Sequence, residues 1–206
     1  ADPTFYDMKE VFFFGAQAIG CDQTCPRDGR KGCAFIDTLP MKHRKPCTDF
    51  LSWTWGYSLG LVCDALRGFC HREARKPEGV FLYMCFFCNN QYRILVEKEE
   101  HGSDHLERIF EPRIKQINSV VALLDTWDKP RYLSRIWTIF EQYVAAKLGV
   151  KMQFILPDEA AQQLRDKFAE GKAGIAFVQH CLLNIDSESA EATVKADEEQ
   201  VKAKIG

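Results

Sequence analysis

Residues 119–149 read SVVALLDTWDKPRYLSRIWTIFEQYVAAKLG, and this stretch decides the fold. It opens with a continuous apolar run at 120–124, which stops at Asp125 and at a turn over 127–130. An apolar run of that length is typical of a parallel strand that is covered on both faces. We therefore predict a buried strand over 119–125.

A long helix is expected after the turn, because Pro130 argues against helix at Lys129. Apolar residues then recur at three- and four-residue steps and form one helical stripe: Ile136, Ile139, Phe140, Tyr143, Val144 and Leu148. Gly149 suits a C-cap, and residues 151–156, KMQFIL, give another strand at once. Strand, helix and strand with short links form the unit of a parallel α/β sheet.

The remaining chain repeats this alternation. Strands are expected at 49–55 and 80–87, where the second reads VFLYMCFF. Helices are expected at 58–72, 104–117 (interrupted by Pro112), 158–171 (capped by Asp158), 174–185 and near 197–205. We predict an α/β domain with a three-layer, open parallel sheet, flavodoxin-like in strand order.

Two regions are expected along the chain. Residues 47–206 carry the α/β pattern, and residues 1–46 form an extension rich in Cys, Pro and Gly that packs on the main domain. Residues 1–20 add either a strand or a short helix. Residues 92–103 begin apolar and become a charged loop, which has the composition of a mobile flap.

Composition excludes some partners. The net charge is −2, so nothing points to nucleic acid. No apolar run approaches the roughly 20 residues of a membrane span, and residues 9–20 lack the basic leader of a signal peptide. Nine cysteines, an odd number, include several in apolar elements. We expect free thiols in a reducing compartment, and therefore an intracellular, cytoplasmic protein.

Three side-chain groups have the composition of a metal or redox site. Cys21, Cys25, Cys33 and Cys47, with His43 as a substitute ligand, are a minority zinc interpretation, since paired C-x-x-C knuckles are missing. A disulfide among them is a further alternative to unlinked thiols. Cys85 and Cys88 fit C-x-x-C, but in a strand a redox role is not expected. His101 and His105 lack a third ligand and are expected to be solvated.

Glu141 stands out because its neighbours in the predicted helix are apolar. It lies one turn after Trp137 and two turns after Ser134, so the three share a face. Charged residues are mostly solvated, which favours an exposed glutamate or one paired with Arg135.

Residues 134–157, SRIWTIFEQYVAAKLGVKMQFILP, resemble the segment of TIR (Toll/interleukin-1 receptor) domains in which S-R-W-C-L-x-E-L opens the third helix. The resemblance is closer to a TIR-like module of algal and other protist proteins, with motifs S-H-x-W-G, D-x-F-x-x-N-Q, D-x-W-x-x-P and L-x-R-x-W-C-L-x-E. The matching residues stand in the same order: Ser52, Trp55, Gly56, Phe87, Asn90, Gln91, Asp125, Trp127, Pro130, Leu133, Arg135, Trp137 and Glu141. The tail IDSESAEATVKADEEQV also resembles the end of that module, so the likeness covers roughly residues 47–206.

The resemblance implies a role for Glu141, because the helix glutamate of TIR enzymes is the catalytic residue that cleaves NAD. Two departures weigh against catalysis. The related module usually has Asp where Cys85 stands and His where Trp53 stands.

Sequence and fold together predict a ligand crevice at the ends of the first and third strands, the switch point of the sheet. Tryptophans there can stack on a base, arginines can meet a pyrophosphate, and amides can bond sugar hydroxyls. The candidate ligand-binding residues are Trp53, Trp55, Gly56, Asn89, Asn90, Gln91, Trp127, Arg131, Arg135 and Trp137. The amide run at 88–91 is equally compatible with a self-bonded turn.

Two functions follow as hypotheses. One is a TIR-like protein-interaction or nucleotide-sensing domain that associates with itself or with other proteins. The other is an NAD glycohydrolase, in which Glu141 stabilises the oxocarbenium ion formed as the nicotinamide–ribose bond breaks. A nucleoside deoxyribosyltransferase-like enzyme would use a similar fold. An enzyme requires an open pocket that reaches Glu141, whereas a scaffold fills that space with Trp53, Trp127 or Trp137.

Overall fold

The computed structural model describes residues 2–14, 18–97, 103–183, 190–191, 199 and 201–203. Its sheet is entirely parallel, and the strands lie in the order β2-β1-β3-β4. The strands are β1 (Asp49–Ser52), β2 (Leu82–Tyr83), β3 (Ser119–Leu123) and β4 (Lys151–Ile155). The predicted three-layer, flavodoxin-like α/β class is confirmed, with β1 between β2 and β3.

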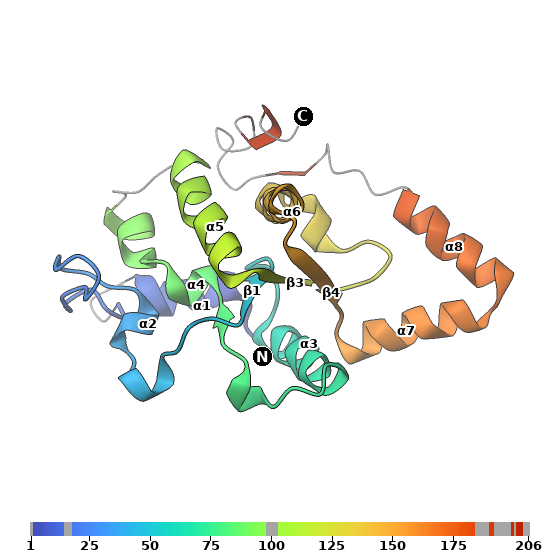
Figure 1. Ribbon diagram of the computed structural model, residues 1–206, viewed down its shortest axis with the longest axis horizontal. Helices are drawn as coiled ribbons and strands as arrows, with labels where there is room; N and C mark the ends of the chain where they lie inside the picture. The colour runs from blue at the N-terminus through green and yellow to red at the C-terminus, as the bar shows by residue number, and fades with distance from the viewer. Residues whose placement is uncertain are drawn as a thin grey trace.

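Helices cover both faces of the sheet (Figure 1). On one face lie α1 (Phe5–Phe13) and α3 (Leu59–Arg72), and on the other lie α5 (Ser103–Ile117) and α6 (Ile136–Leu148). Side chains alternate along β1, so Leu51 packs with α1 and α3 while Phe50 packs with α5 and α6. The same alternation turns Ser52 towards α6.

Residues 119–149 fold as their apolar pattern predicts. β3 is buried from Val120 to Leu123, and α6 buries its apolar stripe against the sheet. Gly149 ends α6 in the left-handed conformation, with φ of 65°, which glycine adopts without a steric cost. One boundary differs, since a separate 3-10 turn, Arg131–Ser134, precedes the helix and contains Ser134.

The predicted strand over 80–87 is wrong in its second half. β2 spans only Leu82–Tyr83, and Cys85–Cys88 forms a helical turn, α4. A short continuous apolar run does not distinguish a strand from a buried helical segment, and Phe86 is fully buried in this turn. The C-x-x-C pair therefore lies on a helical turn and not in a strand. A π-helix, Arg93–Glu97, follows it.

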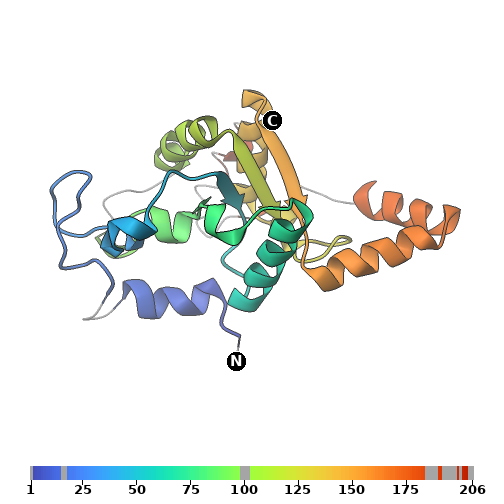
Figure 2. The same cartoon turned by 60° about the horizontal axis from the view of Figure 1, so that its bottom comes forward.

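Two helices form a hairpin that projects from the body of the molecule, α7 (Asp158–Ala169) and α8 (Lys172–Leu183) (Figure 2). The predicted cap by the Asp158 side chain is wrong, because Pro157 takes the N-cap position without a side-chain bond. The carboxylate of Asp64 in α3 instead accepts a 2.9 Å hydrogen bond from the Asp158 amide. The predicted interruption at Pro112 is also wrong, since α5 continues through it.

The first 46 residues contact the α/β body through α1. Thr4 and Asp7 form a capping box at the start of α1, and Phe5 and Phe13 are buried in the core shared with α3. Further along lie a short helix, α2 (Phe35–Thr38), and a 3-10 turn, Met41–His43.

At the other end of the chain, Ala190 and Val201 are buried beside α6. Most of the predicted helix near 197–205 lies outside the described residues, as do His101 and the charged loop at 98–102. Among the helices that the structure describes, none combines the length and the apolar character needed to cross a membrane.

Candidate functional site

Glu141 lies in the interior, where only 6% of its surface is exposed. The hydroxyl of Ser52, at the carboxyl end of β1, donates a short hydrogen bond to the Glu141 carboxyl group. Ser52 is also 2.6 Å from the Tyr132 hydroxyl. The expectation that Glu141 is exposed or paired with Arg135 is therefore wrong. Ser52, 89 residues earlier, supplies the polar partner that makes burial tolerable.

Burial determines the ionisation of the Glu141 carboxyl group. Loss of solvent raises the pKa of Glu141 to about 8, and the bond from Ser52 opposes that shift only in part. The carboxyl group is therefore mostly protonated at neutral pH. Burial likewise raises the pKa of the nearby Cys85 thiol to about 12, with the Glu141 charge adding to the effect. Three facing groups, Glu141, Tyr132 and Ser52, form a neutral, internally bonded cluster.

The predicted switch-point crevice is occupied by the chain itself. Asp125 follows β3 and accepts hydrogen bonds from the Arg131 amide at 2.9 Å and from its Nε at 2.6 Å. A second guanidinium nitrogen of Arg131 donates to the Gly56 carbonyl at 2.9 Å, and the guanidinium carbon lies 5.2 Å from the centre of the Tyr57 ring. Tyr57 itself is fully buried and donates to the Leu123 carbonyl.

Helix α1 engages the other residues expected in this crevice. The Phe5 ring meets Trp53 edge-on at 4.2 Å, and the Tyr6 ring meets Trp55 at 6.0 Å. Arg135 donates a 3.3 Å hydrogen bond to the Tyr6 hydroxyl. The structure thus brings Trp53, Trp55, Gly56, Arg131 and Arg135 to one end of the sheet, as expected. The rings of Trp53 and Trp55 contact α1, and Arg131 and Arg135 donate to Asp125, Gly56 and Tyr6. The buried indole nitrogen of Trp53, in contrast, has no hydrogen-bond partner in the described part of the chain.

The other two tryptophans lie elsewhere. Trp127 contacts Phe177 of α8 at 6.2 Å, and Trp137 packs between Phe110 and Phe140 on the opposite face of the sheet. The four tryptophans therefore do not converge on a single ligand.

The amide run after α4 attaches the extension to the α/β body. Asn90 donates to the Gly32 carbonyl at 2.8 Å and accepts from the Arg93 amide at 3.2 Å. Gln91 donates to the Cys85 carbonyl at 2.8 Å, and Asn89 accepts from the Tyr83 hydroxyl. Asn89 and Asn90, but not Gln91, also line a pocket.

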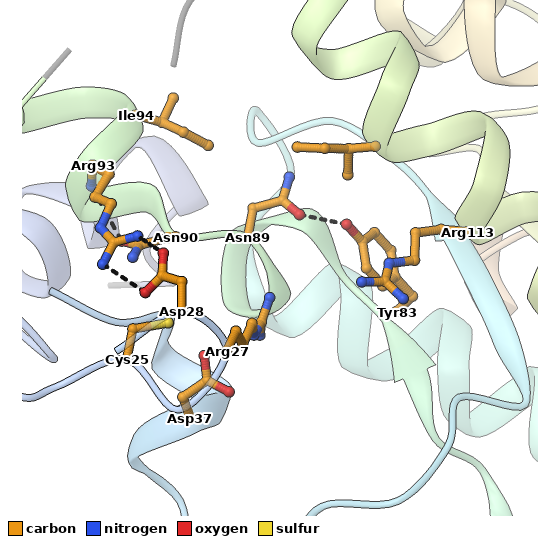
Figure 3. A pocket seen from close by; sticks show the side chains of 11 residues that line it. Cys25, Arg27, Asp28, Asp37, Tyr83, Asn89, Asn90, Arg93, Ile94 and Arg113 are labelled. Atoms are coloured by element: carbon orange, nitrogen blue, oxygen red, sulfur yellow. Dashed lines mark hydrogen bonds and ion pairs between the residues drawn. The ribbon is translucent and has the colours of Figure 1, made fainter. Parts of the chain in front are cut away.

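That pocket has a volume of about 160 Å³ and lies between the extension and the α/β body (Figure 3). The extension contributes Arg27, Asp28 and Asp37, and the body contributes Arg93 and Arg113 in addition to the two asparagines. Glu141 is not among its lining residues. Sequence reasoning missed the arginines because they come from three separate segments with no regular spacing.

All nine cysteines are free thiols in the structure. Within the described ranges, no three His, Cys, Asp or Glu side chains are arranged to hold a metal ion. One pair is in contact: a hydrogen bond with the Cys88 thiol lowers the pKa of Cys47 to about 7 and raises that of Cys88.

The fold and these contacts define a three-layer α/β domain whose switch-point residues contact one another and α1, together with a separate arginine-lined pocket. Comparison with family models found no match, and comparisons with curated proteins and with solved structures also found none.

Proposed function

We propose that this chain is a protein-interaction module that self-associates through α8, in keeping with its resemblance to TIR-like domains. The observation that carries the proposal is the uneven burial of α8. Its sequence, KAGIAFVQHCLL, is apolar on most sides, and a helix of that kind is normally enclosed. Yet over 172–181 only Gly174 and Val178 are buried.

Large apolar side chains are exposed on the same hairpin. Phe177 and Ile175 of α8 are 47% and 42% exposed, and Phe168 of α7 is 47% exposed. Grouped apolar exposure on a projecting element is typical of a protein contact surface. Lys172 and His180 are the only basic residues of α8, and it has no acidic residue, so two copies can meet about a two-fold axis with little charge repulsion.

The surroundings of Glu141 support a non-catalytic role. A residue that stabilises an oxocarbenium ion must be ionised and must contact the sugar, whereas Glu141 is enclosed and largely protonated. Its hydrogen bonds end on Ser52 and Tyr132, and α1 covers the neighbouring end of the sheet.

One observation favours the second candidate, an NAD glycohydrolase. A carboxyl group with a strongly raised pKa at the carboxyl end of a central parallel strand has the features of a catalytic group. Access of a nicotinamide–ribose bond to the Glu141 carboxyl would require the enclosed side chain to become exposed.

Sedimentation equilibrium of the full chain over a range of concentrations tests the interaction proposal. We expect a reversible dimer whose dissociation constant rises at least about tenfold in Phe177→Ser, since the lost apolar contact is worth more than 1.4 kcal/mol. The matched control is Val11→Ser, because Val11 is 76% exposed on α1, a different surface. A wild-type monomer throughout, or equal effects of the two variants, would contradict the proposal.

Incubation with NAD, with nicotinamide release followed by chromatography, tests the second candidate. Release by the wild type that is lost in Glu141→Gln would establish the glycohydrolase. The conservative amide keeps the size of the side chain, and unfolding curves verify that the variant is folded. No release from concentrated wild-type protein would reject catalysis and leave the interaction proposal unaffected.

A further inference from the structure

The pocket of Figure 3 carries an excess of positive charge. Arg93 forms an ion pair with Asp28, and Arg27 lies 2.9 Å from Asp37. A further guanidinium, that of Arg44, is 3.8 Å from the same Asp37. The hydrogen bond from Arg93 keeps the pKa of Asp28 well below its usual range, so Asp28 is charged at neutral pH.

Arg113 is a further arginine that lines the pocket. Its hydrogen-bond partner is the neutral amide of Gln116, at 3.2 Å. Among the described residues that line the pocket, three guanidinium groups, those of Arg27, Arg93 and Arg113, therefore face two carboxylates, which leaves one net positive charge. Both Arg27 and Arg113 line the pocket and are exposed to solvent.

The groups that remain available in the pocket are hydrogen-bond donors. Asn89 is 94% buried, and its carbonyl oxygen accepts from the Tyr83 hydroxyl. Its amide nitrogen has no hydrogen-bond partner within the described part of the chain and turns away from Tyr83 into the pocket (Figure 3). The oxygen of Asn90 and the carboxylates of Asp28 and Asp37 are already engaged.

A buried amide donor in a pocket that exposed guanidinium groups also line suits a ligand that is rich in acceptors and negatively charged. A phosphate monoester has three strong acceptor oxygens and a charge of about −1.5 to −2 at pH 7, which is opposite in sign to the net charge of the lining. The volume of 160 Å³ lies below the roughly 300 to 1,000 Å³ of common ligand pockets, so a dinucleotide does not fit inside.

We propose that this pocket is a binding site for a small phosphate monoester, with Arg27, Arg113 and the Asn89 amide as its donors. The site joins the extension to the α/β body, because Arg27 precedes α2 while Asn89 and Arg113 follow β2. It is separate from α8 and from the switch point, and it does not depend on the proposed interaction function.

Isothermal titration calorimetry of the full chain with ribose 5-phosphate tests the site, with inorganic phosphate as a second probe and ribose as the uncharged control. We expect binding of both phosphate probes, no binding of ribose, and weaker binding as salt is added. In Arg113→Met the dissociation constant should rise at least about tenfold, because loss of a charge-assisted hydrogen bond costs roughly 1.5–3 kcal/mol.

Arg165→Met is the matched control, since Arg165 is an exposed arginine of α7 whose hydrogen bonds, among the described residues, go to Gln162. It should bind ribose 5-phosphate as the wild type does. Asn89→Leu should also weaken binding, and its thermal unfolding shows whether it is folded. The proposal fails if wild-type protein binds neither phosphate probe, if ribose binds equally well, or if Arg113→Met behaves as Arg165→Met.

Discussion

The hydroxyl of Ser52, the last residue of β1, donates a hydrogen bond to the carboxyl group of Glu141 in α6. This contact joins the central strand to the helix that was predicted to carry the chemistry. It exists because alternation along β1 turns Ser52 to the face that α6 covers, while Leu51 packs on the other face.

The raised pKa of Glu141 predicts that its contribution to stability falls as pH rises. The pKa of Glu141 is about 8 in the folded protein against 4.5 for an unperturbed glutamate, which stands for the unfolded chain. Between pH 4.5 and 8 the folded state therefore holds one proton more than the unfolded state. The free energy of unfolding of the wild type relative to Glu141→Gln should therefore drop by about 2 to 5 kcal/mol from pH 4.5 to 8 and stay level above. Urea unfolding at pH 5 and 8.5 measures it. Glu159→Gln, an exposed control on α7, should show no such trend; parallel wild-type and Glu141→Gln curves would refute the assignment.

Asp125 links the end of β3 to the turn that precedes α6. Its carboxylate accepts from Arg131 and from the Tyr57 hydroxyl, and its side chain is 10% exposed. Asp125→Ala should lower the free energy of unfolding by about 1 to 3 kcal/mol, since the amide and the guanidinium of Arg131 lose their acceptor while the Tyr57 hydroxyl keeps the Leu123 carbonyl. Chemical denaturation measures the loss. Asp128→Ala, in the same turn, should change stability by less than about 0.5 kcal/mol, and equal losses at both positions would contradict this account.

Helix α1 should be an integral part of the core. Phe5 is 1% exposed and contacts Trp53 and Phe86, so Phe5→Ala should cost about 3 to 5 kcal/mol in unfolding free energy. Val11 lies on the same helix but is 76% exposed, and Val11→Ala should change stability by less than about 0.5 kcal/mol. Thermal and urea unfolding compare the two. A small effect at Phe5 would mean that α1 is only loosely attached.

The thiol of Cys47 should be unusually reactive. Its pKa is lowered to about 7 by the hydrogen bond with the Cys88 thiol, with the charge of Arg113 assisting. Alkylation by iodoacetamide, followed by peptide mass spectrometry from pH 6 to 9, should show a rate at Cys47 with its midpoint near pH 7. Cys85, with a pKa near 12, should remain unmodified in this range. In Cys88→Ala the Cys47 midpoint should move upward; an unchanged midpoint would show that Cys88 is not the cause.

The secondary structure could be predicted where several independent sequence signals indicate the same element. Between 119 and 156, apolar periodicity, the proline turn and the glycine C-cap all indicate the same strand, helix and strand, and the structure has them. At 80–87 the only pattern was a continuous apolar run, and such a run is equally compatible with a strand and with a buried helical segment. Tertiary burial of Phe86 then favoured a helical turn.

The sites were less predictable because they depend on contacts between distant segments. Nothing near Glu141 in the sequence indicates that Ser52 will be its hydrogen-bond partner in the interior. Trp53, Trp55, Gly56, Arg131 and Arg135 lie at one end of the sheet, whereas Trp127 and Trp137 do not join them, and α1, whose structure was left open, contacts Trp53 and Arg135. The arginine pocket combines side chains from before α2, from the π-helix and from α5.

The position of α1 also determines the order in which the chain can fold. Phe5 and Phe13 precede their partners, Trp53 and Phe86, by roughly 50 to 80 residues, and β1 pairs with a strand about 70 residues further on. During synthesis Phe5 and Phe13 therefore lack these ring contacts until the segment that carries Trp53 and Phe86 has left the ribosome. These core contacts are non-local, which slows their formation and prolongs the exposure of the apolar side chains of α1. A chaperone that binds apolar helical segments would meet α1 before the core does.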